Sequence, residues 1–354
     1  MRTMLEDART RIARLLEVQG DDVIFTSGAT EANALAILGY VRATRKRAGS
    51  DTPGRNNLHV LYLPSAHASI VENAKRLALE GVTVEPLPIK DSRVDVALLA
   101  EMIRPETVLV AMEAVCGETG VVWNTREVGE VLRKARTSDR PAIVLHVDAS
   151  QAPLTEKITR DHFGAGTLVL DASKVSDVRS LGVLIAHRTI PLESLYGGGG
   201  QERGLRPGTE NPEGAARFAA ALESVVRSRA AFRKKSGKIR KLLAERILKD
   251  IPNVFVQEGK EQVPNILNVA LVGRDTDYLV ALLDEAGFAV STKSACETDS
   301  EEGSRAVFVL TGDAERARAT LRVSWGPGFS ARAAARFVRA LVRETAFIDK
   351  GSSE

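Results

Sequence analysis

An aspartate and a lysine lie at the ends of two apolar runs in the middle of the chain. The run 142–147 is apolar except for one histidine and ends at Asp148, and the run 167–170 ends at a polar segment that contains Lys174. Such runs are typical of strands buried on both faces of a parallel sheet, and ligands bind at the carboxyl ends of these strands. A lysine amine for an aldehyde and a carboxylate for a protonated pyridine nitrogen are what pyridoxal phosphate requires. The pair predicts a cofactor site, although polar strand ends are more often simply solvated.

A second candidate feature is a glycine-containing turn between an early strand and a helix. Residues 22–26 predict a strand, and Ser27-Gly28-Ala29-Thr30 leads into a helix-forming run that extends to about residue 45. Backbone N–H groups at the start of a helix are free to bind a phosphate group. The alternative is an ordinary capped helix that binds nothing.

The two cysteines of the chain differ in their surroundings. Cys116 follows a strand end and has the properties of a small packed side chain, whereas Cys296 lies in the polar segment 293–303, which predicts an exposed loop. Free cysteines are usually buried, so a thiol in an exposed loop favours a nucleophile, which needs access in order to react. Two cysteines exclude a disulfide framework, and because no Cys/His grouping has the spacing of zinc ligands we expect no metal site.

The composition is that of a globular protein of about two domains. The 354 residues are 44% hydrophobic and 27% charged, with a net charge of +3, which is too small to favour nucleic acid or an anionic membrane as a partner. The amino-terminal residues have apolar side chains at helical spacing among many charges, unlike a signal peptide, and no apolar run is long enough to cross a membrane. We therefore expect a cytoplasmic protein.

Strands and helices alternate through the first part of the chain, which predicts a parallel sheet covered by helices. An Ala-rich helix then becomes strongly basic near residue 228, where we place the boundary between a large domain, 1–228, and a small α+β domain, 229–354. Four consecutive glycines, 197–200, indicate either close approach to a neighbouring group or a flexible tether. The strands expected in the small domain are 253–257, 266–272, 288–291 and 319–325, and its expected helices are 276–286 and 330–345.

Five segments carry a resemblance to a known family. They are FTSGATEAN at 25–33, VDASQ at 147–151, GGQER at 199–203 with RPGT at 206–209, SAC at 294–296 and LRVS at 321–324. Together, and in this order, they resemble the motifs of the cysteine desulfurases, which are fold-type-I pyridoxal phosphate enzymes of aminotransferase class V. The resemblance implies an α/β large domain, with a mixed, mostly parallel sheet covered by helices, and a smaller C-terminal α+β domain.

The resemblance implies a role for each residue around the cofactor ring. Lys174 would hold the aldehyde as a Schiff base and later move protons at the substrate's α-carbon. Asp148 would pair with the pyridine nitrogen, and Gln151 would hydrogen-bond the ring hydroxyl. His67 would stack on the ring and shuttle protons, although its position alone indicates a surface histidine at the start of a helix.

The cofactor's phosphate has its own expected contacts. Thr30 would bind it together with the amides of Gly28 and Ala29, and Ser173 would lie at the same place. Thr209 would reach the phosphate from the other subunit, so the resemblance implies a homodimer.

The implied substrate is L-cysteine. Arg322 would bind its carboxylate through two parallel hydrogen bonds, with Asn33 also at the substrate, whereas a lone arginine in a strand more often forms a surface ion pair. Cys296, as a thiolate, would take the substrate sulfur as a persulfide and release L-alanine. The sulfur would then pass to an acceptor protein, either an iron–sulfur scaffold or a tRNA thiolation enzyme.

The chain departs from the family's pattern near the cofactor. The usual asparagine pair before Glu118 is Cys116-Gly117, which removes one contact to the ring hydroxyl. Asp171 stands where a phosphate-binding serine is expected, so it would repel the phosphate unless Ser173 takes over or Asp171 turns away. Residues 177–180, Asp-Val-Arg-Ser, replace the usual Gly-Pro-Lys-Gly.

These departures keep three hypotheses in play. An active desulfurase is the first. A related class V enzyme, a cysteine or selenocysteine lyase, would keep Lys174 and Asp148 without needing Cys296, and a non-catalytic scaffold dimer would explain Asp171 and Gly117. The chain begins near the family's first long helix, so we expect either a truncated sequence or a site more open than usual.

Overall fold

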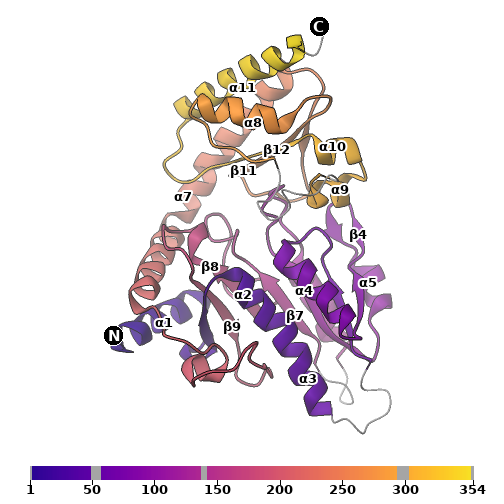
Figure 1. The fold of residues 1–354 in the computed structure, drawn as a ribbon, viewed down its shortest axis with the longest axis vertical. Coiled ribbons are helices and arrows are strands. Elements are labelled where there is room, and N and C mark those ends of the chain that lie inside the picture. The colour runs from indigo at the N-terminus through magenta and orange to yellow at the C-terminus, as the bar shows by residue number, and fades with distance from the viewer. Residues whose placement is uncertain (1, 49–56, 137–141, 293–302, 352–354) are drawn as a thin grey trace. The chain divides into compact units, whose positions relative to one another are not determined.

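The computed structural model describes residues 2–48, 57–136, 142–292 and 303–351, which divide into two units (Figure 1). The first unit contains the chain up to Val115 and from Trp123 to Arg229, and the second contains Cys116–Val122 and the chain from Ala230 onward. The predicted boundary at residue 228 lies one residue before this division. That residues 116–122 belong with the second unit was not predicted from the sequence.

The first unit is built on a seven-stranded mixed sheet with strand order β1-β9-β8-β7-β6-β2-β3. Strand β9 runs antiparallel to both β1 and β8, and all the other pairs are parallel. Every strand except β9 therefore ends at the same edge of the sheet, which confirms the predicted mixed, mostly parallel arrangement. The strands are β1 (Val23–Thr26), β2 (His59–Tyr62), β3 (Thr83–Pro86), β6 (Thr107–Glu113), β7 (Val144–Asp148), β8 (Thr167–Asp171) and β9 (Gly182–Ala186).

Helices of the first unit cover this sheet, and one of them packs directly on the strands that end in the predicted site. Helix α2 (Ala29–Ala34) continues through a π-helical turn (Leu35–Gly39) into α3 (Tyr40–Ala48). Leu35 of this helical segment is buried in one apolar cluster with Ile24 of β1 and Val169 of β8. The remaining elements of this unit are α4 (Ala68–Leu79), α5 (Val96–Met102), α6 (Thr125–Lys134) and the short strands β4 (Ile89–Lys90) and β5 (Arg93–Val94).

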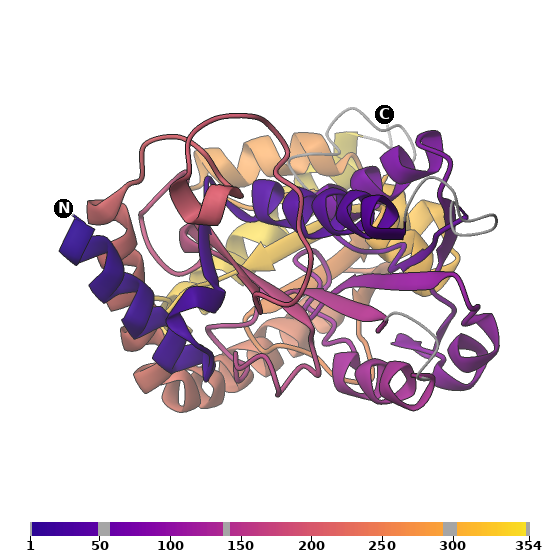
Figure 2. The same ribbon diagram turned by 90° about the horizontal axis from the view of Figure 1, so that it is seen from below.

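Helix α1 (Arg2–Leu16) is amphipathic, as its apolar spacing predicts. It buries Leu5, Ala8 and Ile12. Arg11 of α1 forms a bidentate ion pair with Glu223 of α7 (Pro212–Asp250). Its Nε lies 3.0 Å from Oε1 and its Nη2 lies 2.8 Å from Oε2. The two helices accordingly lie side by side in the first unit (Figure 2).

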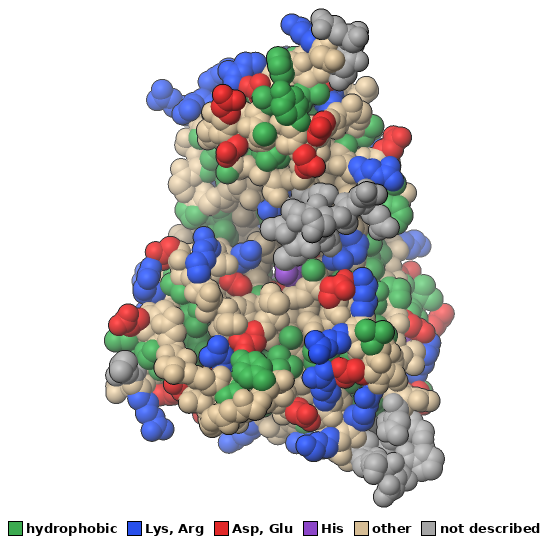
Figure 3. Space-filling view, in the orientation of Figure 1, with side chains coloured by type: hydrophobic (Ala, Val, Ile, Leu, Met, Phe, Trp, Pro, Cys, Tyr) green, Lys and Arg blue, Asp and Glu red, His purple; other side chains and the backbone are tan. Residues whose placement is uncertain are grey.

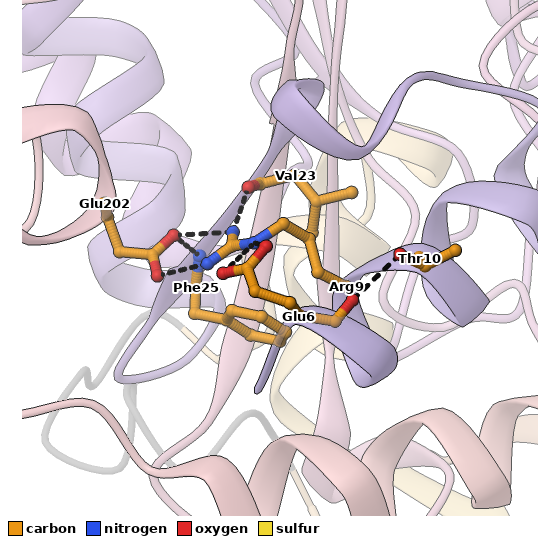
Figure 4. A network of polar contacts seen from close by, with 6 residues as sticks. All are labelled: Glu6, Arg9, Thr10, Val23, Phe25 and Glu202. Carbon is orange, nitrogen blue, oxygen red and sulfur yellow. Dashed lines mark hydrogen bonds and ion pairs between the residues drawn. The ribbon is translucent and has the colours of Figure 1, made fainter. Parts of the chain in front are cut away.

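A buried ion pair fixes the glycine-rich segment, residues 197–208, to the edge of the sheet (Figure 4). The Glu202 carboxylate accepts hydrogen bonds from Arg9 at 2.9 and 2.7 Å and from the backbone N–H of Phe25 at 2.9 Å. Glu202 itself has φ +48° and the next residue, Arg203, has φ +62°, a left-handed backbone that side chains rarely adopt. The segment is therefore held close to its neighbours at this point, which excludes a flexible tether here.

The second unit contains a three-stranded antiparallel sheet and its helices. The sheet order is β10 (Val254–Gln257), β11 (Ile266–Leu271) and β12 (Thr320–Ser324), with helices α8 (Thr276–Glu285), α9 (Arg305–Thr311), α10 (Ala314–Arg318) and α11 (Ala331–Gly351). The strand predicted at 288–291 is wrong, because only Ser291 pairs, in an isolated bridge with Arg322. Helices α9 and α10 were not predicted.

Surface properties of the described residues add little to the composition. Lys and Arg side chains are interspersed with Asp and Glu on the face drawn in Figure 3. None of the described helices is both long enough and apolar enough to span a membrane.

Candidate active site

The predicted acid and lysine lie at the ends of two adjacent parallel strands. Strands β7 and β8 are paired with Asp148 opposite Val169, and Lys174 ends the short 3₁₀ turn that directly follows β8. The backbone of Asp148 is fixed by the sheet, because its carbonyl accepts from Ala114 N–H at 2.8 Å. The Lys174 side chain is exposed, and within the described part of the chain it forms no hydrogen bond or ion pair.

The Asp148 carboxylate is buried and held on both oxygens. Only 7% of the residue is exposed. Its Oδ1 accepts from Ser150 N–H at 2.9 Å, and its Oδ2 accepts from the side-chain amide of Asn33 at 2.7 Å. Hydrogen bonds of this kind stabilise the ionised form and orient it. Asp148 is therefore a positioned carboxylate, as a partner for a protonated ring nitrogen must be.

Asn33 connects Asp148 to a larger buried network. It is fully buried in α2, and its Nδ2 also donates to Ser69 Oγ at 2.8 Å. Since both Nδ2 hydrogens are used, Asn33 Oδ1 must accept from His146 Nε2, 3.0 Å away. The expected role of Asn33 at the substrate stays a prediction, and in this structure its amide binds Asp148, Ser69 and His146.

His146 completes this network from within strand β7. It is fully buried, and its Nδ1 lies 2.9 Å from Thr167 Oγ1 on β8, which donates to it when Nε2 carries the proton. Burial lowers the pKa of His146 to about 4, against the opposing effect of the nearby Asp148 charge. The imidazole is therefore neutral at physiological pH.

His67 lies at the start of α4, at the same edge of the sheet. Its ring Nδ1 accepts from Ser69 N–H at 3.2 Å and lies 2.8 Å from Ser69 Oγ. Because Ser69 Oγ also accepts from Asn33, its own proton points to Nδ1. Nδ1 of His67 is thus an acceptor, which places the proton of the neutral ring on Nε2.

Glu113 is a further acidic residue at this edge of the sheet that the sequence analysis did not predict. Glu113 ends β6 directly opposite Asp148 of β7, is only 5% exposed, and accepts from His67 N–H at 3.2 Å. A glutamate that ends an apolar strand, like a histidine inside one, is an unusual core residue, and that signal could have identified Glu113 and His146. Asn33 and Ser69 carry no such signal, because polar residues near helix starts are common.

The turn that is predicted to bind a phosphate holds a carboxylate of the chain itself. Asp171 Oδ2 accepts from Ala29 N–H at 2.9 Å, and its Oδ1 accepts from Ser173 N–H at 2.8 Å. Asp171 therefore turns toward the turn that contains Gly28 and does not turn away. The expected contact of Ser173 with a phosphate stays a prediction, since here its amide caps Asp171.

A second carboxylate lies at the same turn. Glu31 Oε2 accepts from Ser27 N–H at 2.5 Å, while Tyr196 O–H donates to its other oxygen and Arg206 Nε lies 3.4 Å away. Burial opposes ionisation of Glu31, but these hydrogen bonds outweigh it and lower its pKa. Glu31 is therefore negatively charged and holds the turn in place.

The other predicted ring and phosphate contacts stay predictions. Thr30 and Thr209 are exposed and Gln151 is half-buried. None of the three forms a side-chain hydrogen bond within the described residues. Their side chains are available for the roles that the resemblance implies.

In the second unit Arg322 is half-buried on β12. Its Nη1 donates to Gly117 O at 3.1 Å, and its backbone N–H donates to Ser291 O at 2.6 Å. Ser291 lies two residues before the segment 293–303, and Cys296 itself lies outside the described residues. Past that segment, Ser304 is buried and bonded to Glu118 at 2.6 Å.

The residues present fit most of pyridoxal phosphate. Asp148 suits the pyridine nitrogen and the exposed Lys174 amine suits the aldehyde. Gln151 is free to meet the ring hydroxyl. At the phosphate end the turn is built as expected, but Asp171 already uses the Ala29 amide.

The sequence and the fold both match known proteins. The aminotransferase class-V family model matches residues 1–327. The chain is 30% identical to the cysteine desulfurase IscS 1 of Archaeoglobus fulgidus, with 92% of this chain and 81% of that protein covered. It is 31% identical to the mitochondrial cysteine desulfurase of Arabidopsis thaliana, with 91% and 68% covered.

Solved structures agree on the fold. A NifS-like protein superposes with a TM-score of 0.85 at 22% identity, covering 98% of this chain and 88% of that one. DndA from Streptomyces lividans superposes with a TM-score of 0.76 at 27% identity, covering 92% and 89%. With its acid and lysine at adjacent strand ends and a family match over most of its length, this chain belongs to the class-V aminotransferases, among relatives that are cysteine desulfurases.

Proposed function

We propose that this protein is a pyridoxal phosphate-dependent cysteine desulfurase, which moves sulfur from L-cysteine to Cys296 and releases L-alanine. The observation that carries the proposal is the placement of two residues at the ends of adjacent strands. One is Asp148, which is buried and held by hydrogen bonds on both oxygens, and the other is the exposed Lys174. Curated relatives that are 30% and 31% identical to this chain are cysteine desulfurases.

The residues of the first unit have distinct tasks in this reaction. When bound, the cofactor supplies an electron-withdrawing ring that weakens bonds at the substrate's α-carbon. Asp148 accepts the hydrogen bond of the ring nitrogen, and Asn33 keeps the carboxylate oriented. Lys174 holds the aldehyde and moves the α-proton, while His67 exchanges protons through Nε2.

Residues of the second unit bind the substrate and receive its sulfur. Arg322 binds the cysteine carboxylate, and its side chain is half-buried on β12. The Cys296 thiolate attacks the substrate sulfur. A sulfur–sulfur bond forms, the carbon–sulfur bond breaks, and its electron pair stays with the carbon fragment that is protonated to alanine.

The proposal extends to the partners of the enzyme. Thr209 joins the phosphate site of a second copy, so the working form is a homodimer. The persulfide on Cys296 is taken by an acceptor protein of iron–sulfur assembly or tRNA thiolation in the cytoplasm. A solved relative, SspA, 25% identical, was obtained in complex with cysteine, which supports cysteine as the substrate.

The test compares the two cysteines. Cys296→Ala removes the nucleophile, so we expect sulfide release from L-cysteine with a thiol reductant to fall about 100-fold or more. Cys116→Ala is the matched control, because Cys116 is only 2% exposed, and it should keep most of the activity. Undiminished release by Cys296→Ala would indicate a lyase instead. Absence of both activity and cofactor absorbance in the parent protein would indicate a non-catalytic scaffold.

A further inference from the structure

The turn that meets the cofactor's phosphate in the proposed function is occupied by a side chain of the same subunit. Asp171 joins two backbone amides, Ala29 N–H at 2.9 Å and Ser173 N–H at 2.8 Å. The Ala29 amide opens α2, which is followed by the π-helical turn and then by α3. Amides at such a position favour an anion, and here the anion is the Asp171 carboxylate.

The sheet explains how Asp171 reaches this amide. Gly182 of β9 pairs with Thr26 of β1 on one side and with Asp171 of β8 on the other. A β-carbon on Gly182 would lie 2.7 Å from the carbonyl carbon of Gly28, so only glycine allows the turn and β8 to approach this closely. The contact between Asp171 and Ala29 is therefore built into the strand register and does not depend on an exposed loop.

Charge at the turn also disfavours a phosphate in this state. Glu31 is a second carboxylate there, bound to Ser27 N–H and kept ionised by its hydrogen bonds. Arg206 lies 3.4 Å from Glu31. Within the described residues, no hydrogen bond or ion pair joins Asp171 to a lysine or arginine side chain. A phosphate that replaced the carboxylate at the Ala29 amide would therefore be repelled by the nearby charge of Asp171, which no described lysine or arginine side chain pairs with.

We propose that Asp171 is a specificity-determining residue that occupies the phosphate position, so that this protein binds pyridoxal about as tightly as pyridoxal phosphate. The phosphate can use the Ala29 amide only after the carboxylate has left it. The ring nitrogen and aldehyde contacts, made by Asp148 and Lys174, are the same for both aldehydes. The inference rests on the proposed function, since it concerns the same cofactor site.

The test measures the dissociation constants of both aldehydes by equilibrium dialysis against the cofactor-free full-length protein. For the parent protein we expect the two constants to agree within about tenfold. Asp171→Ser keeps a cap acceptor for Ser173 N–H but frees the Ala29 amide. It should tighten pyridoxal phosphate binding by about tenfold or more, equal to about 1.4 kcal/mol, and leave pyridoxal unchanged.

Two variants control for folding and for charge. Asp171→Asn keeps the size and cap of the residue but removes its charge, and it should tighten pyridoxal phosphate binding in the same direction. Asp177→Ser removes an exposed carboxylate that pairs with Arg217 at 2.5 Å and forms no described hydrogen bond or ion pair with the turn at residues 27–30, and it should change neither constant. Circular dichroism verifies that each variant is folded.

A measurement without any aldehyde separates the two proposals. Inorganic phosphate should raise the melting temperature of Asp171→Ser and Asp171→Asn but not that of the parent or of Asp177→Ser. If no protein binds either aldehyde, the proposed function is wrong, while the phosphate result still decides the role of Asp171. The role of Asp171 is refuted if both Asp171 variants bind pyridoxal phosphate and inorganic phosphate no better than the parent does.

Discussion

The Asp148 carboxylate is oriented by two groups of the protein that surround it. Its charge is kept in a nearly dry position by the Asn33 amide and by Ser150 N–H. Asn33 is in turn held by His146, so a neutral imidazole is connected to the Asp148 carboxylate through one amide group. Buried polar groups are stabilising only when all of them are paired, which this network achieves for the Asn33 amide.

The neutral state of His146 predicts that the folded protein becomes less stable at acid pH. Because its pKa falls from 6.5 to about 4 on burial, the unfolded chain binds a proton in this range that the folded chain does not. The free energy of unfolding therefore keeps its full value above pH 6.5. As the pH falls toward 4, the titration of His146 lowers it by up to about 3 kcal/mol. Urea unfolding of the parent and of His146→Gln between pH 7.5 and 4.5 measures this.

The two curves should converge as the pH falls, because the variant lacks this titration. His59 and His162, whose pKa values burial also lowers, remain in both proteins and cancel in the comparison. Two parallel curves would contradict the predicted role of His146.

At the scale of elements, the site depends on how the outermost strands are joined to their neighbours. Strand β1 is followed directly by the turn of Gly28, and Phe25 in β1 is fixed by Glu202 from the glycine-rich segment. Glu202 is bound on its far side by Arg9 of α1. One buried carboxylate thus joins three segments that are distant in sequence.

Glu202→Gln is therefore expected to weaken the first unit strongly. It leaves the Arg9 guanidinium, whose side chain is 12% exposed, without its buried partner, and breaking such a pair costs about 3–5 kcal/mol. Urea unfolding measures this loss, and limited proteolysis should show faster cleavage within 197–208. Glu6→Gln is the control, because Glu6 binds the same arginine from a position that is 55% exposed, and it should change stability by less than about 1 kcal/mol.

Much of this arrangement could be predicted from local sequence patterns. Apolar runs that end in polar residues identified β7 and β8, and with them Asp148 and Lys174. Contacts that depend on strand register could not be predicted, and the approach of Asp171 to Ala29 across Gly182 is the main example. The residues 288–291 have the composition of a strand, but only Ser291 finds a pairing partner.

At the scale of the whole molecule, the proposed homodimer is tested by mass. Sedimentation equilibrium at micromolar concentration should give twice the mass of one chain, because Thr209 is proposed to act in the partner's site. A monomer at this concentration would contradict the proposal. Lys174→Ala should leave the mass unchanged, since Lys174 is exposed and forms no hydrogen bond or ion pair with the described residues.

Thr209 also connects the dimer to the proposed role of Asp171. Thr209→Ala should weaken pyridoxal phosphate binding more in the Asp171→Ser protein than in the parent, because only there does the phosphate fully occupy its position. Equal effects in both backgrounds would indicate that the two residues act independently.

The path of residues 116–122 has a consequence for how the protein is made. Their backbone groups bond to Glu261, Val263 and Asn268, which belong to the second half of the chain. On the ribosome this strip emerges long before those partners are translated. The second unit therefore closes late in synthesis, and a nascent chain that stops before β11 carries an early strip of backbone whose hydrogen-bonding groups face water or a chaperone.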